Sequence, residues 1–231
     1  MSLMARMIGV FFSPRATYAS IAAHPRALGA LGLVTAIAIA ANVAFASTAV
    51  GRDALLDVQV RFMESWGMTI SDEMYAGMER QVETMAVPNA AIGQLVFYPV
   101  VAAAVSGLLL GVFSAIMGGN ATFKHVFAVV AHSGFIIALS QLFVMPLSYA
   151  RGTLSAAANL GVFLPFLDET SLLARFLGSV DLFVIWWLLN LAIGLGVLYK
   201  KRTQPVAISL LAVYIGIALV FALVRAAISG A

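Results

Sequence analysis

Long apolar runs constrain this chain more than any other feature of its sequence. Runs of about 20 or more apolar residues alternate with short polar stretches, and a helix needs about 20 residues to cross a hydrocarbon layer of about 30 Å. Apolar residues make up 62% of the chain and charged residues only 10%, which is too little polar material to cover a soluble fold. The pattern predicts an all-α, polytopic membrane protein whose 231 residues form a single membrane domain.

Five transmembrane helices are predicted, with four or six as the alternative counts. The predicted spans are residues 27–47, 89–117, 124–149, 179–199 and 205–224.

Residues 1–26 are expected to form an interfacial helix on the cytoplasmic face. Apolar residues recur in this segment at helical spacing: Met4, Met7, Ile8 and Phe11. Ser13 followed by Pro14 is typical of an N-cap and a first helical turn. The first long apolar run begins only near residue 27, so the segment is expected to be retained rather than removed as a signal peptide.

Residues 51–88 change composition abruptly and carry seven acidic and three arginine residues. Apolar residues recur among them at three- or four-residue steps: Leu55, Val58, Phe62, Trp66, Met74, Met78, Val82 and Met85. This spacing predicts two amphipathic helices outside the bilayer, separated near residues 67–71. The methionines suit adaptable contacts, so the loop is interpreted as a cap on the helices, a segment resting on the outer leaflet, or a protein-binding element.

Residues 150–178 are interrupted by glycine, proline and charged residues and are expected to form a second extracytoplasmic loop. Within this loop, the sequence leaves open whether residues 160–167 enter the bilayer.

A stripe of small residues marks the second span. It consists of Ala103, Gly107, Gly111, Ala115 and Gly119 at four-residue intervals. Small residues one turn apart let a second helix approach closely inside a membrane, so the stripe is expected to be a helix-packing face. The turn at residues 118–120 makes the second and third spans an antiparallel hairpin.

Loop charges favour a cytoplasmic N-terminus and, with five spans, an extracytoplasmic C-terminus. Seven basic and no acidic residues then face the cytoplasm, against six basic and nine acidic residues on the opposite side. Lys200, Lys201 and Arg202 form a cytoplasmic basic cluster that is expected to anchor this topology. Binding of anionic lipid headgroups is compatible with that role.

Three short passages stand out together. The first is Phe-Phe-Ser-Pro-Arg at residues 11–15, followed by Tyr18 and by Ala-Ala-His-Pro-Arg at residues 22–26. The others are Met-Gly-Gly-Asn-Ala-Thr-Phe-Lys at residues 117–124 and Ser-Val-Asp-Leu-Phe-Val-Ile-Trp at residues 179–186. Together these passages extend over most of the chain. Their order and spacing resemble a short prokaryotic member of the Yip family, the Ypt/Rab-interacting-protein membrane domain.

This resemblance implies five spanning helices, a cytoplasmic N-terminus and an extracytoplasmic C-terminus. For a short prokaryotic member it also implies the bacterial inner membrane. Eukaryotic relatives are associated with vesicle traffic and Rab GTPases and carry a long cytoplasmic N-terminal region. Only about 26 residues precede the first predicted span here, so Rab GTPase binding is not expected.

Four polar side chains at or within the predicted spans form a candidate intramembrane polar site: His132, Gln141, Asp181 and Asn190. His132 is interpreted either as a buried neutral imidazole or as part of a proton relay with Ser133, Gln141 and Asp181. Asp181 either lies in the first helical turn, handles protons or ions, or pairs with a subunit or a lipid headgroup. Asn190 and Asn42 are expected to make hydrogen bonds between helices.

Several chemistries lack the residues that they need. The chain has no cysteine, which removes disulfides, thiolate metal sites and a cysteine nucleophile. It has no His-Glu-x-x-His motif and no phosphate-binding loop, and Ser133 points about 100° away from His132 on a helix. No catalytic residue, metal site or cofactor is therefore expected. The scattered basic residues do not indicate nucleic-acid binding.

The leading prediction is a non-enzymatic membrane protein that organises or assists other membrane proteins or lipids. Its expected partners are membrane lipids and other membrane proteins or copies of itself. The alternative is a small transporter or channel with a polar site around His132 and Asp181. Lipid handling at the leaflet surface is a third hypothesis, based on the N-terminal helix and the basic cluster.

Overall fold

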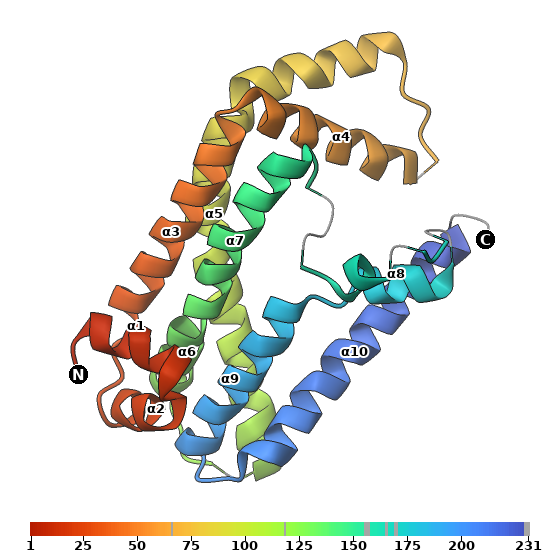
Figure 1. Cartoon of the computed structure of the whole chain (residues 1–231). Coiled ribbons are helices and arrows are strands. Elements are labelled where there is room, and N and C mark those ends of the chain that lie inside the picture. Colours follow the sequence, from red (N-terminus) through yellow and green to blue (C-terminus); the bar gives the residue numbers. More distant parts are fainter. Residues whose placement is uncertain (66, 118, 155–157, 165, 169–170, 229–231) are drawn as a thin grey trace. The chain divides into compact units, whose positions relative to one another are not determined.

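The long apolar runs of the sequence form helices. The structure is a computed structural model that describes every residue except 66, 118, 155–157, 165, 169–170 and 229–231, so Trp66 of the amphipathic loop lies outside the described residues. In chain order the elements are α1 (Leu3–Phe12), α2 (Pro14–Ala23), α3 (Leu28–Ala46), α4 (Ala49–Ser65), α5 (Asp72–Met117), α6 (Phe123–Ser133), α7 (Phe135–Arg151), the 3₁₀-helix η1 (Leu160–Phe163), α8 (Leu172–Gly178), α9 (Leu182–Leu198) and α10 (Thr203–Ile228) (Figure 1). The fold is all-α over the described residues.

Four helical segments of the described chain are long and apolar enough to cross a bilayer. They are Leu28–Ala46, Asp72–Ser114, Phe123–Arg151 and Thr203–Ala227. These segments overlap the first, second, third and fifth predicted spans. The fourth predicted span corresponds to α9, which is also apolar but has only 17 residues.

The third of these segments consists of α6 and α7, which meet at Gly134. The Tyr98 hydroxyl group of α5 occupies the position that a Cβ atom would take at Gly134, so a glycine is required there. Helical hydrogen bonding continues through this point, because the Gly134 N–H donates to the Val130 carbonyl at 3.1 Å and the Ala138 N–H donates to the Gly134 carbonyl at 2.9 Å.

The chain divides into two units that alternate along the sequence. Unit 1 comprises Met1–Ile37, Gln94–Ser140 and Phe183–Tyr214, and unit 2 comprises Ala38–Gly93, Gln141–Leu182 and Ile215–Ala231. Helices α3, α5, α7 and α10 contribute residues to both units.

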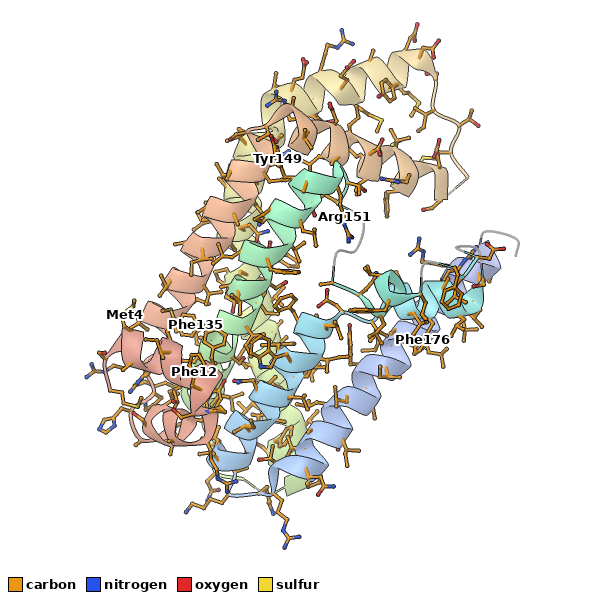
Figure 2. The ribbon with its side chains drawn as sticks, viewed as in Figure 1. Met4, Phe12, Phe135, Tyr149, Arg151 and Phe176 are labelled. Carbon is orange, nitrogen blue, oxygen red and sulfur yellow. The ribbon has the colours of Figure 1, made fainter. Side chains whose placement is uncertain are left out.

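Unit 1 holds one apolar core in which α1 and α2 contact α6 (Figure 1). Its largest fully buried apolar side chains are Tyr18, Ile21, Phe135, Ile136, Leu191 and Leu195. One face of α1 lies outside this core: Met4, Ile8 and Phe12 are 57%, 54% and 85% exposed. Figure 2 shows Met4 and Phe12 on α1 and Phe135 among the helices. Exposed apolar residues at four-residue steps are typical of a helix that lies on a membrane.

Two residues that precede helices do not cap them through their side chains. Ser13 precedes α2, but its side chain makes no capping hydrogen bond, and Pro14 alone provides the expected first-turn residue. Thr122 precedes α6, and its hydroxyl group is hydrogen-bonded to His125 Nδ1 at 2.8 Å rather than to a backbone N–H. In each case the residue marks the helix start without capping it through its side chain.

In unit 2, α4 and the first part of α5 form a helical hairpin. The sequence predicted two helices separated near residues 67–71, and in the structure α4 ends at Ser65 and α5 begins at Asp72. Helix α5 continues past Pro88 without interruption and reaches 46 residues, so the second predicted loop helix and the second predicted span lie in one helix. One proline removes one helical hydrogen bond, whereas residues 72–87 are rich in good helix formers.

The loop before α9 is tied to the start of that helix. The Leu160 N–H donates to the Val180 carbonyl at 2.9 Å, and the Leu182 N–H donates to the Ala158 carbonyl at 3.0 Å. Within residues 160–167, η1 covers the first four, and Phe163 and Phe166 are 65% and 78% exposed. This segment therefore presents aromatic side chains on its surface.

Candidate functional site

The four residues of the predicted polar site fall into two groups. His132 and Asn190 belong to unit 1, whereas Gln141 and Asp181 belong to unit 2. His132, Gln141 and Asn190 are each hydrogen-bonded to residues outside this set.

Asn190 holds the N-terminal helices against α9. It is 3% exposed, its Oδ1 accepts from the Tyr18 hydroxyl at 2.5 Å, and its Nδ2 donates to the Val10 carbonyl at 2.8 Å. Tyr18 lies in α2 and Val10 in α1, so one amide side chain bonds to both helices. Burial raises the pKa of Tyr18 well above its ordinary value, so its hydroxyl remains the donor of this bond. The predicted interhelical role of Asn190 is confirmed by these two bonds.

Arg6 strengthens the same junction. Only 5% of this arginine is exposed, and its guanidinium donates to the His24 carbonyl at 3.3 Å and to the Ser20 carbonyl at 3.5 Å. These carbonyls belong to the C-terminal end of α2, where a cation is favoured by the helix dipole. Burial, and then Arg26, lower the pKa of Arg6. The sequence reasoning assigned Arg6 to the basic cytoplasmic face and did not predict this contact.

His132 is fully buried and bonded to its own helix. Its Nδ1 lies 2.7 Å from the Ala128 carbonyl, which can only accept, so Nδ1 carries the proton. Nε2 is buried and has no hydrogen-bond partner among the described residues, and Phe135 approaches the imidazole edge-on. The adjacent Ser133 bonds elsewhere, donating to the Val130 carbonyl and accepting from Trp187 Nε1 at 2.9 Å.

Gln141 and Asp181 each connect two segments of unit 2. Asn42 donates to Gln141 Oε1 at 2.9 Å and so joins α3 to α7, which confirms the interhelical role predicted for Asn42. The backbone of Asp181 pairs with that of Asn159 in an isolated antiparallel bridge. Asp181 immediately precedes α9, so the alternative that placed it in the first turn of this helix differs from the structure by one residue.

The small-residue stripe of the second span has open space beside two of its five residues. A Cβ atom at Gly107 or Gly111 would meet no described atom within 4 Å beyond the local helix. Ala103 is half-buried, and the side chain of Ala115 lies outside the described residues. At Gly119 the ring of Tyr199 takes the place of a side chain. The stripe therefore contacts its own unit at Gly119 and leaves Gly107 and Gly111 uncovered by the described chain.

The basic cluster occupies the turn between α9 and α10. Lys200 has a positive φ of 52°, and the Lys201 N–H donates to the Gly196 carbonyl at 2.8 Å, which closes the end of α9. The side chains of Lys200, Lys201 and Arg202 are exposed. The cluster is therefore held in a tight turn with its charges accessible.

A pocket of about 450 Å³ lies in unit 2 between α3, α4 and the first part of α5. Its polar lining consists of four amide side chains: Asn42, Gln59, Gln81 and Asn89. The remaining lining is apolar and includes Phe45 and Phe62, and no charged residue contributes. Sequence reasoning missed this pocket, although Val58 and Phe62, which line it, belong to the amphipathic pattern of the loop.

Within the described part of the chain, no group of three His, Asp or Glu side chains is placed to hold a metal ion. What the arrangement does provide is a set of polar links between helices and one neutral pocket.

A family model described as the Yip1 domain matches residues 8–225. No curated protein and no solved structure matches the chain.

Proposed function

The chain belongs to the Yip1 domain family, and from this premise we propose that it is a non-enzymatic membrane protein that organises or assists other membrane components. Its partners in this proposal are membrane lipids and other membrane proteins or copies of itself, without a Rab GTPase. The apolar helices and the family match make the chain an integral membrane protein.

The observation that carries the proposal is the exposed end of the α4–α5 hairpin. Met68, Met74 and Tyr75, here called the hairpin tip, are 43%, 41% and 46% exposed. They stand among acidic residues, with Asp72 and Glu73 in the first turn of α5. Exposed apolar side chains with a polar rim are typical of protein-binding surfaces, and flexible methionines adapt to a partner.

The proposal includes five spans, a cytoplasmic N-terminus, an extracytoplasmic C-terminus and a bacterial inner membrane. Helix α9 supplies the fourth span in this arrangement, because its 17 residues lie at the lower end of the length that crosses a bilayer, about 17–25 residues. The hairpin tip then faces the extracytoplasmic side, and the basic cluster faces the cytoplasm.

Purification in mild detergent from cells with two differently tagged copies tests the proposal, with a photo-crosslinking residue in place of the exposed Thr69 beside the hairpin tip. We expect a self-complex or a defined complex with another membrane protein, and we expect its loss in the variant Met74→Ser with Tyr75→Ser. The control is Met4→Ser, which changes an exposed methionine on α1. A strictly monomeric particle without any crosslinked partner would contradict the proposal.

A further inference from the structure

The amide-lined pocket of unit 2 is a feature separate from the hairpin tip. Three helices form it: Asn42 and Phe45 come from α3, Gln59 and Phe62 from α4, and Asn89 from α5. Its volume of about 450 Å³ falls in the range of small-molecule sites, roughly 300–1,000 Å³.

The lining excludes a charged ligand group. Among the described residues, no Asp, Glu, Lys, Arg or His side chain lines the pocket, so a carboxylate or phosphate entering it would lose its hydration without gaining an ion pair from them. Primary amides instead offer neutral donors and acceptors. The chemistry of the walls therefore selects an uncharged ligand with hydrogen-bonding groups.

Two acceptor atoms define what that ligand has to donate. The Oε1 atom of Gln59 is buried and has no hydrogen-bond partner within the described chain. Asn42 uses its Nδ2 to donate to the Ala38 carbonyl and to Gln141 Oε1, both at 2.9 Å, so Oδ1 is the atom that it can offer a ligand. The Gln59 Oε1 atom calls for a hydroxyl or N–H donor, since an unpartnered buried acceptor costs free energy, and the Oδ1 atom of Asn42 can accept a second donor.

The position of the pocket indicates where the ligand comes from. Asn42, Phe45 and Ala46 lie at the C-terminal end of the candidate span Leu28–Ala46, where the hydrocarbon layer gives way to the polar interface. The opposite walls belong to the amphipathic helices α4 and α5. A lipid in the adjacent leaflet reaches this place with its chain against the apolar walls and its head against the amides.

We infer that this pocket binds an uncharged, hydroxyl-bearing lipid, of which a monoacylglycerol is the representative. The two hydroxyl groups of its glycerol head donate to Gln59 Oε1 and Asn42 Oδ1. The acyl chain lies against Phe45, Phe62 and the other apolar lining residues. This inference does not depend on the proposed role of the hairpin tip.

The inference is tested on the full-length protein in phosphatidylcholine nanodiscs with three probes that share one acyl chain: 1-oleoylglycerol, oleate and methyl oleate. The measurement is binding by native mass spectrometry. We expect 1-oleoylglycerol to bind at least about tenfold more tightly than the other two, because one lost hydrogen bond of about 1.4 kcal/mol corresponds to a factor of ten. Equal binding of all three, or preference for oleate, would overturn the inference.

Two variants separate the pocket from general attachment to the apolar surface. Gln59→Leu removes the unpartnered acceptor and leaves Asn42 Oδ1 in place, so we expect it to lower the affinity for 1-oleoylglycerol about tenfold while the protein stays folded. Ala90→Phe fills the pocket, and we expect it to abolish binding of all three probes. The matched control is Gln204→Leu, which changes an exposed glutamine outside the pocket. Unchanged 1-oleoylglycerol binding in both pocket variants would overturn the assignment.

Discussion

At the scale of single residues, amide and hydroxyl side chains determine how the helices within each unit meet. Asn190 joins α9 to α1 and α2, Asn42 joins α3 to α7, and Trp187 donates from α9 to Ser133 of α6. The sequence predicted interhelical bonds for both asparagines, because polar groups in an apolar environment need partners. It did not predict the partners, since Tyr18 and Asn190 are 172 positions apart and a single sequence does not reveal distant contacts.

Removing the Tyr18–Asn190 hydrogen bond should destabilise unit 1. Asn190→Leu leaves both the Tyr18 hydroxyl and the Val10 carbonyl without their partner, and we expect a loss of about 1–3 kcal/mol of unfolding free energy. Tyr18→Phe should cost less, because only one donor is removed. The measurement is denaturant-induced unfolding of the detergent-solubilised protein.

The double variant Tyr18→Phe with Asn190→Leu tests whether the two residues act together. We expect it to be less destabilised than the sum of the single variants, because the bond is lost only once. Ser209→Ala is the control, since that exposed hydroxyl donates only to the Pro205 carbonyl of its own helix. Strict additivity would show that the two side chains contribute independently.

At the scale of helices, apolar periodicity identified the elements and glycine determined their closest contacts. The spacing in residues 51–88 predicted two helices, and the second of them joins the predicted span at residues 89–117 in the single helix α5. Glycines that look alike in sequence differ in the structure. A Cβ at Gly194 would lie 2.5 Å from Val129 Cγ1 and 3.0 Å from Tyr18 Cδ1, whereas one at Gly107 would meet nothing within 4 Å.

Gly194→Ala and Gly107→Ala should therefore have opposite effects on stability. The first forces α9 away from α2 and α6, and we expect a loss of about 1–3 kcal/mol, as in other overpacked sites. The second removes a flexible residue from an uncrowded helix position, and we expect no loss and a gain of at most about 1 kcal/mol. Thermal unfolding in detergent measures both. Equal destabilisation by the two alanines would contradict the packing described here.

At the scale of the whole molecule, the sequence predicted membrane integration and the helical class, because both depend on composition and run length alone. Exposed apolar side chains along α5 and α10, such as Leu108, Val213 and Phe221, are what a lipid-facing surface requires. The pocket in unit 2 was not predictable in the same way. Its amides come from three helices, and their meeting depends on the tertiary contacts rather than on any local pattern.

The proposed topology predicts a definite labelling pattern, which the absence of native cysteine makes measurable. In spheroplasts, Thr69→Cys and Phe166→Cys should react with a membrane-impermeant maleimide, because both loops face outward in the proposal. Lys201→Cys should react only after permeabilisation. Phe166 and Lys201 lie on either side of α9 in the sequence. Labelling of both from the same side would therefore show that α9 does not span the membrane.

The bond from Asn190 to the N-terminal helices also sets an order of assembly. Val10 and Tyr18 are synthesised 180 and 172 residues before Asn190, the residue to which both are hydrogen-bonded. At about 5–20 residues per second, α1 and α2 wait on the order of ten seconds or more before α9 emerges. Their contacts with α6 can form earlier, but their bond to α9 is consequently a late step of biogenesis. A nascent chain stopped before residue 190 should leave these two helices more accessible to protease than a chain extended through α9.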